Sequence, residues 1–328
     1  MRDLFSARFV IVAGKGGVGR TTVAAALATL AARRGKRTLL AQVNAKDRLT
    51  VLLGGTPVGD TVTTVQPNLD AVNMNPAAAL RQYGLMILRY EAIYKAVLEN
   101  RMVKGFLRAI PGLDDYSMLG KAYWHATEER DGAGRHKYDL VIFDAPATGH
   151  AVTMLRLPQA ILETVPEGPL TQTARRVSEL MHDAARTAMV IVTLAEDLPV
   201  SEARDFYRAN EELLKLPLSA IVVNQLWPRV FDEVSGPGAV FRQLEKTGCG
   251  VGDPMLGPLC ERARTAHERR RLNDRYLERL AIEVPVPQLH LPYLFRPQFG
   301  AAELTDLAGV LDEQLAALQA EDAALAGE

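Results

Sequence analysis

The chain of 328 residues is short of cysteine, of aromatic residues and of excess charge. Its two cysteines, Cys249 and Cys260, fit neither a C-x-x-C pair nor a zinc-ligand set, so buried thiols in a reducing compartment are the simplest expectation. A net charge of −1 leaves no basic footprint for nucleic acid. No apolar run is long enough to cross a bilayer, and the first residues have no signal-peptide core. These absences favour a cytoplasmic globular protein with no nucleic-acid partner and no integral membrane segment.

Several short apolar, β-branched runs predict buried parallel strands. They lie at 9–13, 38–43, 71–74, 140–143, 189–193, 220–223 and 286–291. Helical patterns separate most of them, as is typical of βαβ units. We therefore predict an α/β fold with a mostly parallel, doubly wound sheet and helices on both faces. Since no linker or repeat divides the chain, residues 1–328 are predicted to form a single domain.

Two long segments carry apolar residues at helical spacing. The segment at about 76–131, with Met86, Tyr90, Ile93 and Val97, is predicted to be a helical subregion at one edge of the sheet. A shorter helical stretch runs over 170–186. Both stripes are compatible with core packing or with a groove for an apolar partner helix. At the C-terminus, leucines predict an amphipathic helix at about 302–320, whose acidic end disfavours a membrane-surface role.

A glycine-rich loop follows the first apolar strand and precedes a helix-forming run. Its pattern is G-x-x-x-x-G-K-[ST], except that Arg20 stands in the place of the lysine. Backbone N–H groups of such a loop and of the helix N-terminus together bind phosphate. The residues predicted to bind the phosphates are Gly14, Gly16, Gly17, Val18, Gly19, Arg20, Thr21 and Thr22.

A divalent cation site is predicted beside this loop. Thr21 has the position whose hydroxyl binds Mg²⁺, and Asp144 ends a buried strand where a carboxylate completes the magnesium shell. The small-residue loop at 145–150 suits sensing of the γ-phosphate. The alternative interpretation of Asp144 is a helix cap. The predicted cofactors are a nucleoside triphosphate and Mg²⁺.

With these motifs the sequence resembles the deviant P-loop ATPases of the arsenite-pump and tail-anchored-protein-targeting family, in its bacterial form. The resemblance rests on residues 15–22, on the run 144–150 with 155–158 after it, and on 222–226. It implies hydrolysis of ATP to ADP and phosphate by a homodimer, or by a heterodimer with a related ATPase, and an unidentified protein client. It also implies that Lys15 reaches the partner's phosphates, as an arginine finger does elsewhere. By the same resemblance, Asn224 reads the adenine with its amide and Pro292 lies in the second adenine loop.

The sequence departs from the family pattern at two catalytic positions. Arg20 is planar and forked, whereas the usual lysine acts as a compact point charge. By spacing, Asn44 occupies the place of the family's switch I aspartate, which activates the attacking water. An amide oxygen orients water but is a far weaker proton acceptor than a carboxylate. Asp47, three residues further on, is the alternative base.

The combined motifs predict a dimeric, nucleotide-dependent conformational switch in which Lys15, Asn44, Asp47 and Asp144 carry the catalysis. The alternative is a nucleotide-binding but hydrolysis-poor regulatory or scaffold subunit that pairs with a competent paralogue. A third candidate is the motor of a metalloid pump, for which two cysteines supply too few thiol ligands. Neither the client nor the pathway is predicted.

Overall fold

The structure is a computed structural model that describes residues 3–43, 48–76, 78–79, 81–82, 112–230, 237–246 and 256–326. Its centre is an eight-stranded sheet, in which every pairing is parallel except that of β3 with β4. In sheet order the strands are β3 (Thr63–Gln66), β4 (Leu69–Met74), β2 (Thr38–Val43), β5 (Leu140–Ala147), β1 (Phe9–Gly14), β6 (Thr187–Leu194), β7 (Leu218–Leu226) and β8 (Gln288–Pro292).

The mostly parallel α/β sheet expected from the sequence is confirmed, and β3 is a strand that the sequence pattern did not predict. β3 is a four-residue edge strand of mostly polar side chains, joined to β4 by a tight turn at Pro67-Asn68. Asn68 has a φ of 61°, a left-handed conformation that asparagine tolerates. Because β3 is short and mostly polar, the sequence contains no apolar run from which this edge strand could be predicted.

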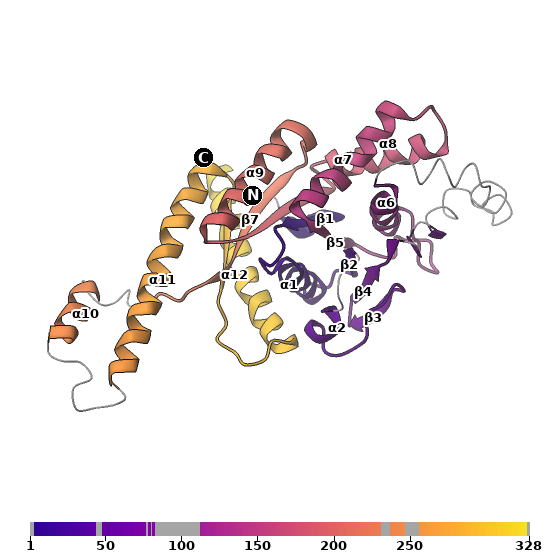
Figure 1. The fold of residues 1–328 in the computed structure, drawn as a ribbon. Helices are drawn as coiled ribbons and strands as arrows, with labels where there is room; N and C mark the ends of the chain where they lie inside the picture. The colour runs from indigo at the N-terminus through magenta and orange to yellow at the C-terminus, as the bar shows by residue number, and fades with distance from the viewer. Residues whose placement is uncertain are drawn as a thin grey trace.

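Helices cover both faces of the sheet (Figure 1). The first face packs against α1 (Arg20–Arg33), α2 (Leu49–Leu52) and α12 (Ala301–Ala326). The second face packs against α6 (Leu113–Thr127), α7 (Thr148–Thr164), α8 (Pro169–His182), α9 (Asp197–Ala209) and the C-terminal part of α11 (Leu256–Glu283). The N-terminal part of α11 extends away from the sheet together with α10 (Pro237–Lys246).

β1 shows why the central strands appear in the sequence as continuous apolar runs. Phe9, Ile11 and Ala13 belong to the core on one face, while Val10 and Val12 belong to the core on the other. Successive side chains point to opposite faces of a strand, and here both faces are covered. The sequence therefore shows no polar alternation at this strand.

α1 is buried almost all round, because it lies between the sheet and α12. Its residues from Val23 to Ala32 are all buried, and most of them are alanines, which allow close approach of the neighbouring elements. A helix that is apolar on every side has no clear amphipathic stripe. The position of α1 therefore places the glycine loop that precedes it firmly against the centre of the sheet.

The helical segments expected beyond the sheet are only partly described. The stripe from Met86 to Val97 lies outside the described residues, and the single-domain organisation stays a prediction. α6 begins at Leu113 and packs against β5 and α7. In α8, the apolar stripe is core: Ala174, Val177 and Leu180 are buried.

Candidate functional site

The glycine loop joins β1 to α1 at the carboxyl end of the central strand. Two of its glycines have no room for a side chain. A Cβ at Gly14 would collide with the backbone carbonyl of Val192 on β6, and a Cβ at Gly19 would collide with the side chain of Asn224. Gly19 also caps α1 with a φ of 84°. The loop therefore lies closely against the ends of β6 and β7, with its backbone accessible to a ligand.

Asn224 braces this loop from the end of β7. Its Nδ2 donates to the carbonyl of Val18 at 3.0 Å, and its Oδ1 accepts from the Gln225 backbone N–H at 2.9 Å. The residue is only 4% exposed. The role in adenine recognition that the family resemblance implies for Asn224 stays a prediction. The contact with Val18 is a second, structural role that no motif indicates.

Arg20 is held at the centre of the site by two oxygen atoms. Its Nε donates to Asp144 Oδ1 at 2.9 Å and its Nη1 donates to the Gly14 carbonyl at 2.8 Å. Asp144, on β5, is 2% exposed. A buried carboxylate is costly without a partner, and Arg20 supplies the compensating charge. Arg20, predicted to bind phosphate, and Asp144, predicted to bind the metal ion, are therefore bound to each other.

The second oxygen of Asp144 completes a small buried network. Thr21 Oγ1 donates to Asp144 Oδ2 at 2.7 Å, and Gln42 Nε2 lies 3.2 Å from both of these oxygens. Asp144 and Gln42 are register partners on the adjacent strands β5 and β2. Sequence reasoning missed Gln42, whose signal was only its place near the end of a buried strand. Helix α1 and two strands thus converge on one carboxylate.

The oxygen atoms of this network suit a divalent cation. Mg²⁺ prefers oxygen ligands and is commonly held by one or two side chains together with substrate phosphates. Thr21 and Asp144 offer such atoms side by side, so they would hold the ion. The buried Oε1 of Gln42 has no hydrogen-bond partner within the described ranges. The residues present therefore fit the metal that the sequence predicts.

Lys15, at the start of the loop, makes an ion pair within the chain. Its Nζ donates to Glu202 Oε1 on α9 at 2.6 Å. Both side chains are part-exposed, at 27% for Lys15 and 33% for Glu202. Water screens such a pair, which makes it weak and easily exchanged. Glu202 was not identified from the sequence, because nothing in its local pattern links it to the loop.

Those of the other predicted site residues that the structure describes lie around the same edge of the sheet. Thr22 is in the first turn of α1, and Pro292 ends β8 beside Leu226 of β7. Asn44 and Asp47 follow β2 but lie outside the described residues. Because β2 is the neighbour of β5, the segment that holds these two residues begins at the same edge of the sheet as Asp144.

Three aromatic rings at the ends of β7 and β8 were also missed. Trp227 stacks on Tyr293 with centroids 5.9 Å apart and planes 13° apart, and Phe295 meets both rings. Tyr293 and Phe295 are 40% and 59% exposed. They follow the predicted adenine residues Asn224 and Pro292 by one to three positions. Exposed rings at this place offer a stacking surface for a planar ligand.

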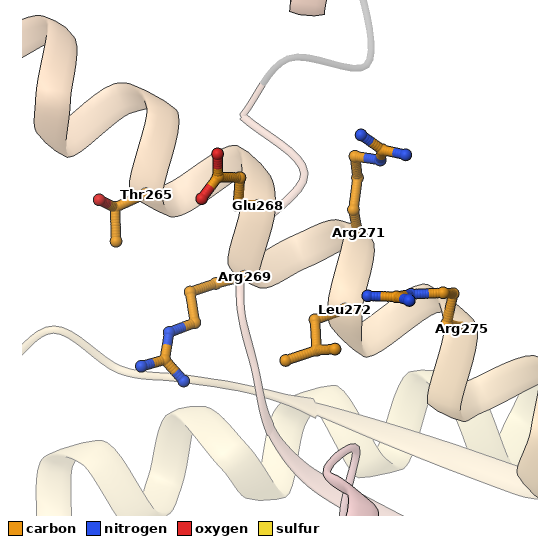
Figure 2. Close-up of a pocket in the computed structure, with 6 residues that line it drawn as sticks. All are labelled: Thr265, Glu268, Arg269, Arg271, Leu272 and Arg275. Atoms are coloured by element: carbon orange, nitrogen blue, oxygen red, sulfur yellow. The ribbon is translucent and has the colours of Figure 1, made fainter.

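A separate pocket lies on α11 and contains none of the predicted site residues. It has a volume of about 510 Å³ and is lined by Thr265, Glu268, Arg269, Arg271, Leu272 and Arg275. Figure 2 shows these side chains along one helix, with Arg271 directed away from Arg269. The glycine loop has the backbone donors that phosphate requires, so the predicted nucleotide site lies there and not at this pocket.

Two expectations about features outside the site can be compared with the structure. Cys260, expected to be a buried thiol, is half-buried on α11 and disulfide-bonded, so that expectation was wrong. Nothing in its spacing revealed this, because disulfide formation depends on the position of the chain in space. Of the helices in the described ranges, none combines the length and the apolar character that a membrane crossing requires.

The fold and the loop define the class of the protein: an α/β nucleotide-binding protein of the P-loop type. The family model described as anion-transporting ATPase matches residues 7–167. The ATPase BagA of Mycobacterium tuberculosis is 30% identical over 232 residues, which cover 69% of this chain and 67% of that protein. The chain therefore belongs to the anion-transporting ATPase family, and ATPase is its enzyme class.

More distant relatives carry two different names. The ATPase GET3 of Kluyveromyces lactis is 27% identical over 262 residues, covering 69% of this chain and 74% of that protein. An arsenical pump-driving ATPase of Acidiphilium multivorum is 26% identical over 264 residues, covering 73% of this chain and 42% of that protein. Both names contain the enzyme class ATPase, and only the second also names a process, the driving of an arsenical pump.

Proposed function

We propose that this chain is a dimeric ATPase that acts as a nucleotide-dependent conformational switch. ATP binding would close the dimer, and hydrolysis to ADP and phosphate would open it and release a client or partner protein. The observation that carries this proposal is the convergence of Thr21 and Asp144, whose side-chain oxygens lie 2.7 Å apart beside the glycine loop. The family's enzyme class, ATPase, supports the hydrolytic step.

The proposed roles follow from the positions of the residues. The backbone N–H groups from Gly14 to Thr22 bind phosphate oxygens, and Arg20 neutralises their charge. Bound Mg²⁺ would polarise the transferred phosphoryl group, with Thr21 and Asp144 holding the ion. Lys15 leaves Glu202 and contacts the nucleotide of the partner subunit. This last step makes closure of the dimer depend on ATP.

The base of the nucleotide is proposed to lie at the ends of β7 and β8. Asn224 and Pro292 flank this position, and the rings of Trp227 and Tyr293 provide a surface on which adenine stacks. Because Asn224 also holds the Val18 carbonyl, occupation of the base site is coupled to the shape of the phosphate loop.

A second candidate is supported by one observation. The ion pair between Arg20 and Asp144 occupies the carboxylate that would hold a metal ion, and Asn44 stands in the place of a base. Such a chain would bind nucleotide, hydrolyse it poorly, and serve as a regulatory or scaffold subunit beside a competent paralogue. A metalloid-pump motor, as in the Acidiphilium relative's name, is the third candidate, for which the sequence supplies only two cysteines.

A steady-state ATPase assay separates the first two candidates. Under the first, the parent protein turns over ATP in the presence of Mg²⁺ and Lys15→Ala abolishes turnover. Lys36→Ala is the matched control, because Lys36 precedes β2 at the opposite end of the sheet. Tight ATP binding by calorimetry with no turnover in the parent protein would instead support the second.

Dimerisation and location have their own tests. The switch requires more dimer with a non-hydrolysable ATP analogue than with ADP, measured by light scattering after size-exclusion chromatography. A mixture with a paralogue would show whether the dimer is homomeric or heteromeric. We propose the cytoplasm as the compartment, because ATP is supplied there. The disulfide at Cys260 weighs against a reducing compartment, and cell fractionation decides between the two arguments.

A further inference from the structure

One nitrogen of the Arg20 guanidinium makes no hydrogen bond within the described residues. Nε is bound to Asp144 and Nη1 is bound to the Gly14 carbonyl, whereas Nη2 has no hydrogen-bond partner in the part of the chain that the structure describes. The side chain is 16% exposed, so this group is not fully enclosed. A guanidinium presents its donors as a rigid fork. Arg20 can therefore bind a phosphate oxygen through Nη2 without leaving Asp144.

A lysine in the same position could not do this as well. Its ammonium is a compact point charge on a flexible chain, and it moves as a unit from one anion to another. Arginine spreads its charge over three nitrogens and bridges two anions at once. The substitution at position 20 thus changes which groups can share one cation, although the charge is the same.

Asp144 is the carboxylate that Arg20 binds and that a divalent cation would also use. Its Oδ1 accepts from Arg20, and its Oδ2 accepts from Thr21 and Gln42, so both oxygens are engaged within the chain. A divalent cation that takes Asp144 Oδ2 as a ligand has to enter beside the permanent positive charge that Arg20 holds against Oδ1, at a residue that is 2% exposed. The fixed cation already neutralises the carboxylate and is placed beside the phosphates.

We propose that Arg20 acts as an internal competitor of the divalent cation, so that this chain binds ATP with an affinity almost independent of Mg²⁺. Arg20 bridges Asp144 and the phosphates, and Thr21 and Asp144 would hold Mg²⁺ only after Arg20 has released the carboxylate. Mg²⁺ is then a requirement of turnover and not of binding. The proposal rests on the proposed nucleotide site and adds to it an order of events that the usual lysine does not impose.

Calorimetric titration with ATP tests the proposal, with the protein in excess Mg²⁺ or in EDTA. In the parent chain the two dissociation constants should agree within about threefold, below the roughly tenfold that one good charged contact contributes. In Arg20→Lys, Mg²⁺ should tighten ATP binding by about tenfold or more. Asp144→Asn in the Arg20→Lys background is the matched control, and it should remove the regained dependence on Mg²⁺.

The outcomes are distinct from those of the ATPase assay. Binding by the parent that is about tenfold or more tighter in Mg²⁺ would overturn the role of Arg20 and leave the nucleotide site standing. An Arg20→Lys protein as insensitive to Mg²⁺ as its parent would overturn it too. If the parent binds no ATP in either buffer, the proposed function itself is wrong. The parent comparison alone decides the matter should Arg20→Lys fail to fold, which circular dichroism would show.

Discussion

Lys15 Nζ lies 2.6 Å from Glu202 Oε1, so the first lysine of the glycine loop is paired with an acidic residue of α9 in the same chain. For Lys15 to reach the nucleotide of a partner subunit, this contact has to break. Both side chains are part-exposed, and such pairs contribute about 0–1 kcal/mol. The contact is therefore a weak restraint that ATP and a partner can overcome.

Glu202→Gln should release this restraint and favour the closed dimer. We expect ATP-dependent dimerisation to strengthen by up to about fivefold, which corresponds to ~1 kcal/mol. Sedimentation equilibrium in the presence of a non-hydrolysable ATP analogue measures the change. Glu211→Gln, which neutralises an exposed glutamate just beyond α9, is the control and should leave the dimer unchanged. Weaker dimerisation in Glu202→Gln would show that Glu202 supports the closed state.

Gly19 and Asn224 should show strong energetic coupling. Gly19→Ala imposes a side chain at a φ of 84° and forces it into the Asn224 amide, so we expect a loss of about 2 kcal/mol or more in the free energy of unfolding. In an Asn224→Ala background the collision is absent, and the loss from Gly19→Ala should be smaller. Urea unfolding of the four proteins measures the coupling.

Gly35 provides the control for this cycle. It has a φ of 80°, and no neighbouring atom lies within 4 Å of the place that a methyl group would take, so Gly35→Ala tests backbone strain without a collision. Its cost should be the same in both backgrounds. Strict additivity of Gly19→Ala and Asn224→Ala would contradict the contact between the loop and β7.

Asn44→Asp should restore a general base. A positioned base contributes about 10²–10⁴-fold to a rate. We therefore expect kcat to increase by about 10²-fold, while the affinity for ATP changes little. Steady-state kinetics with saturating ATP measures this. Asp47→Asn in the parent chain is the companion variant: a large fall in its kcat would identify Asp47 as the base already in use, and Asn44→Asp would then add little.

His125 predicts a dependence of stability on pH. Burial lowers the pKa of its imidazole below the ordinary 6.5, although Glu129 opposes this at 2.6 Å; Lys121 and Lys137 lower it further. The unfolded state therefore binds a proton more readily, and the free energy of unfolding falls as the pH drops through 6.5. His125→Gln should reduce this fall between about pH 7 and pH 5.

Chemical unfolding at several pH values measures the slope. His150→Gln is the control, because the imidazole of His150 is exposed in the first turn of α7, whereas that of His125 is buried. An equal slope in His125→Gln and its parent would mean that His125 is not the group responsible.

The fold class and the proximity of Thr21 to Asp144 could be predicted because both depend on local patterns. The apolar runs around β1 and β5 needed burial on two faces, and the carboxyl ends of parallel strands meet at one edge of a sheet. Thr21 and Asp144 were therefore expected near each other, and their side-chain oxygens lie 2.7 Å apart. β3 escaped prediction because an edge strand of four mostly polar residues carries no such pattern.

The sequence by itself determined the glycine loop, its order between a strand and a helix, and the kinds of side chain that flank it. Only the tertiary structure decided how the charges pair. Arg20 is 124 positions from Asp144 and Lys15 is 187 positions from Glu202. Local propensity acts over a few residues, whereas the strand order β2-β5-β1-β6 sets which carboxylate each cation meets. The partners of both cations are thus a property of the folded sheet.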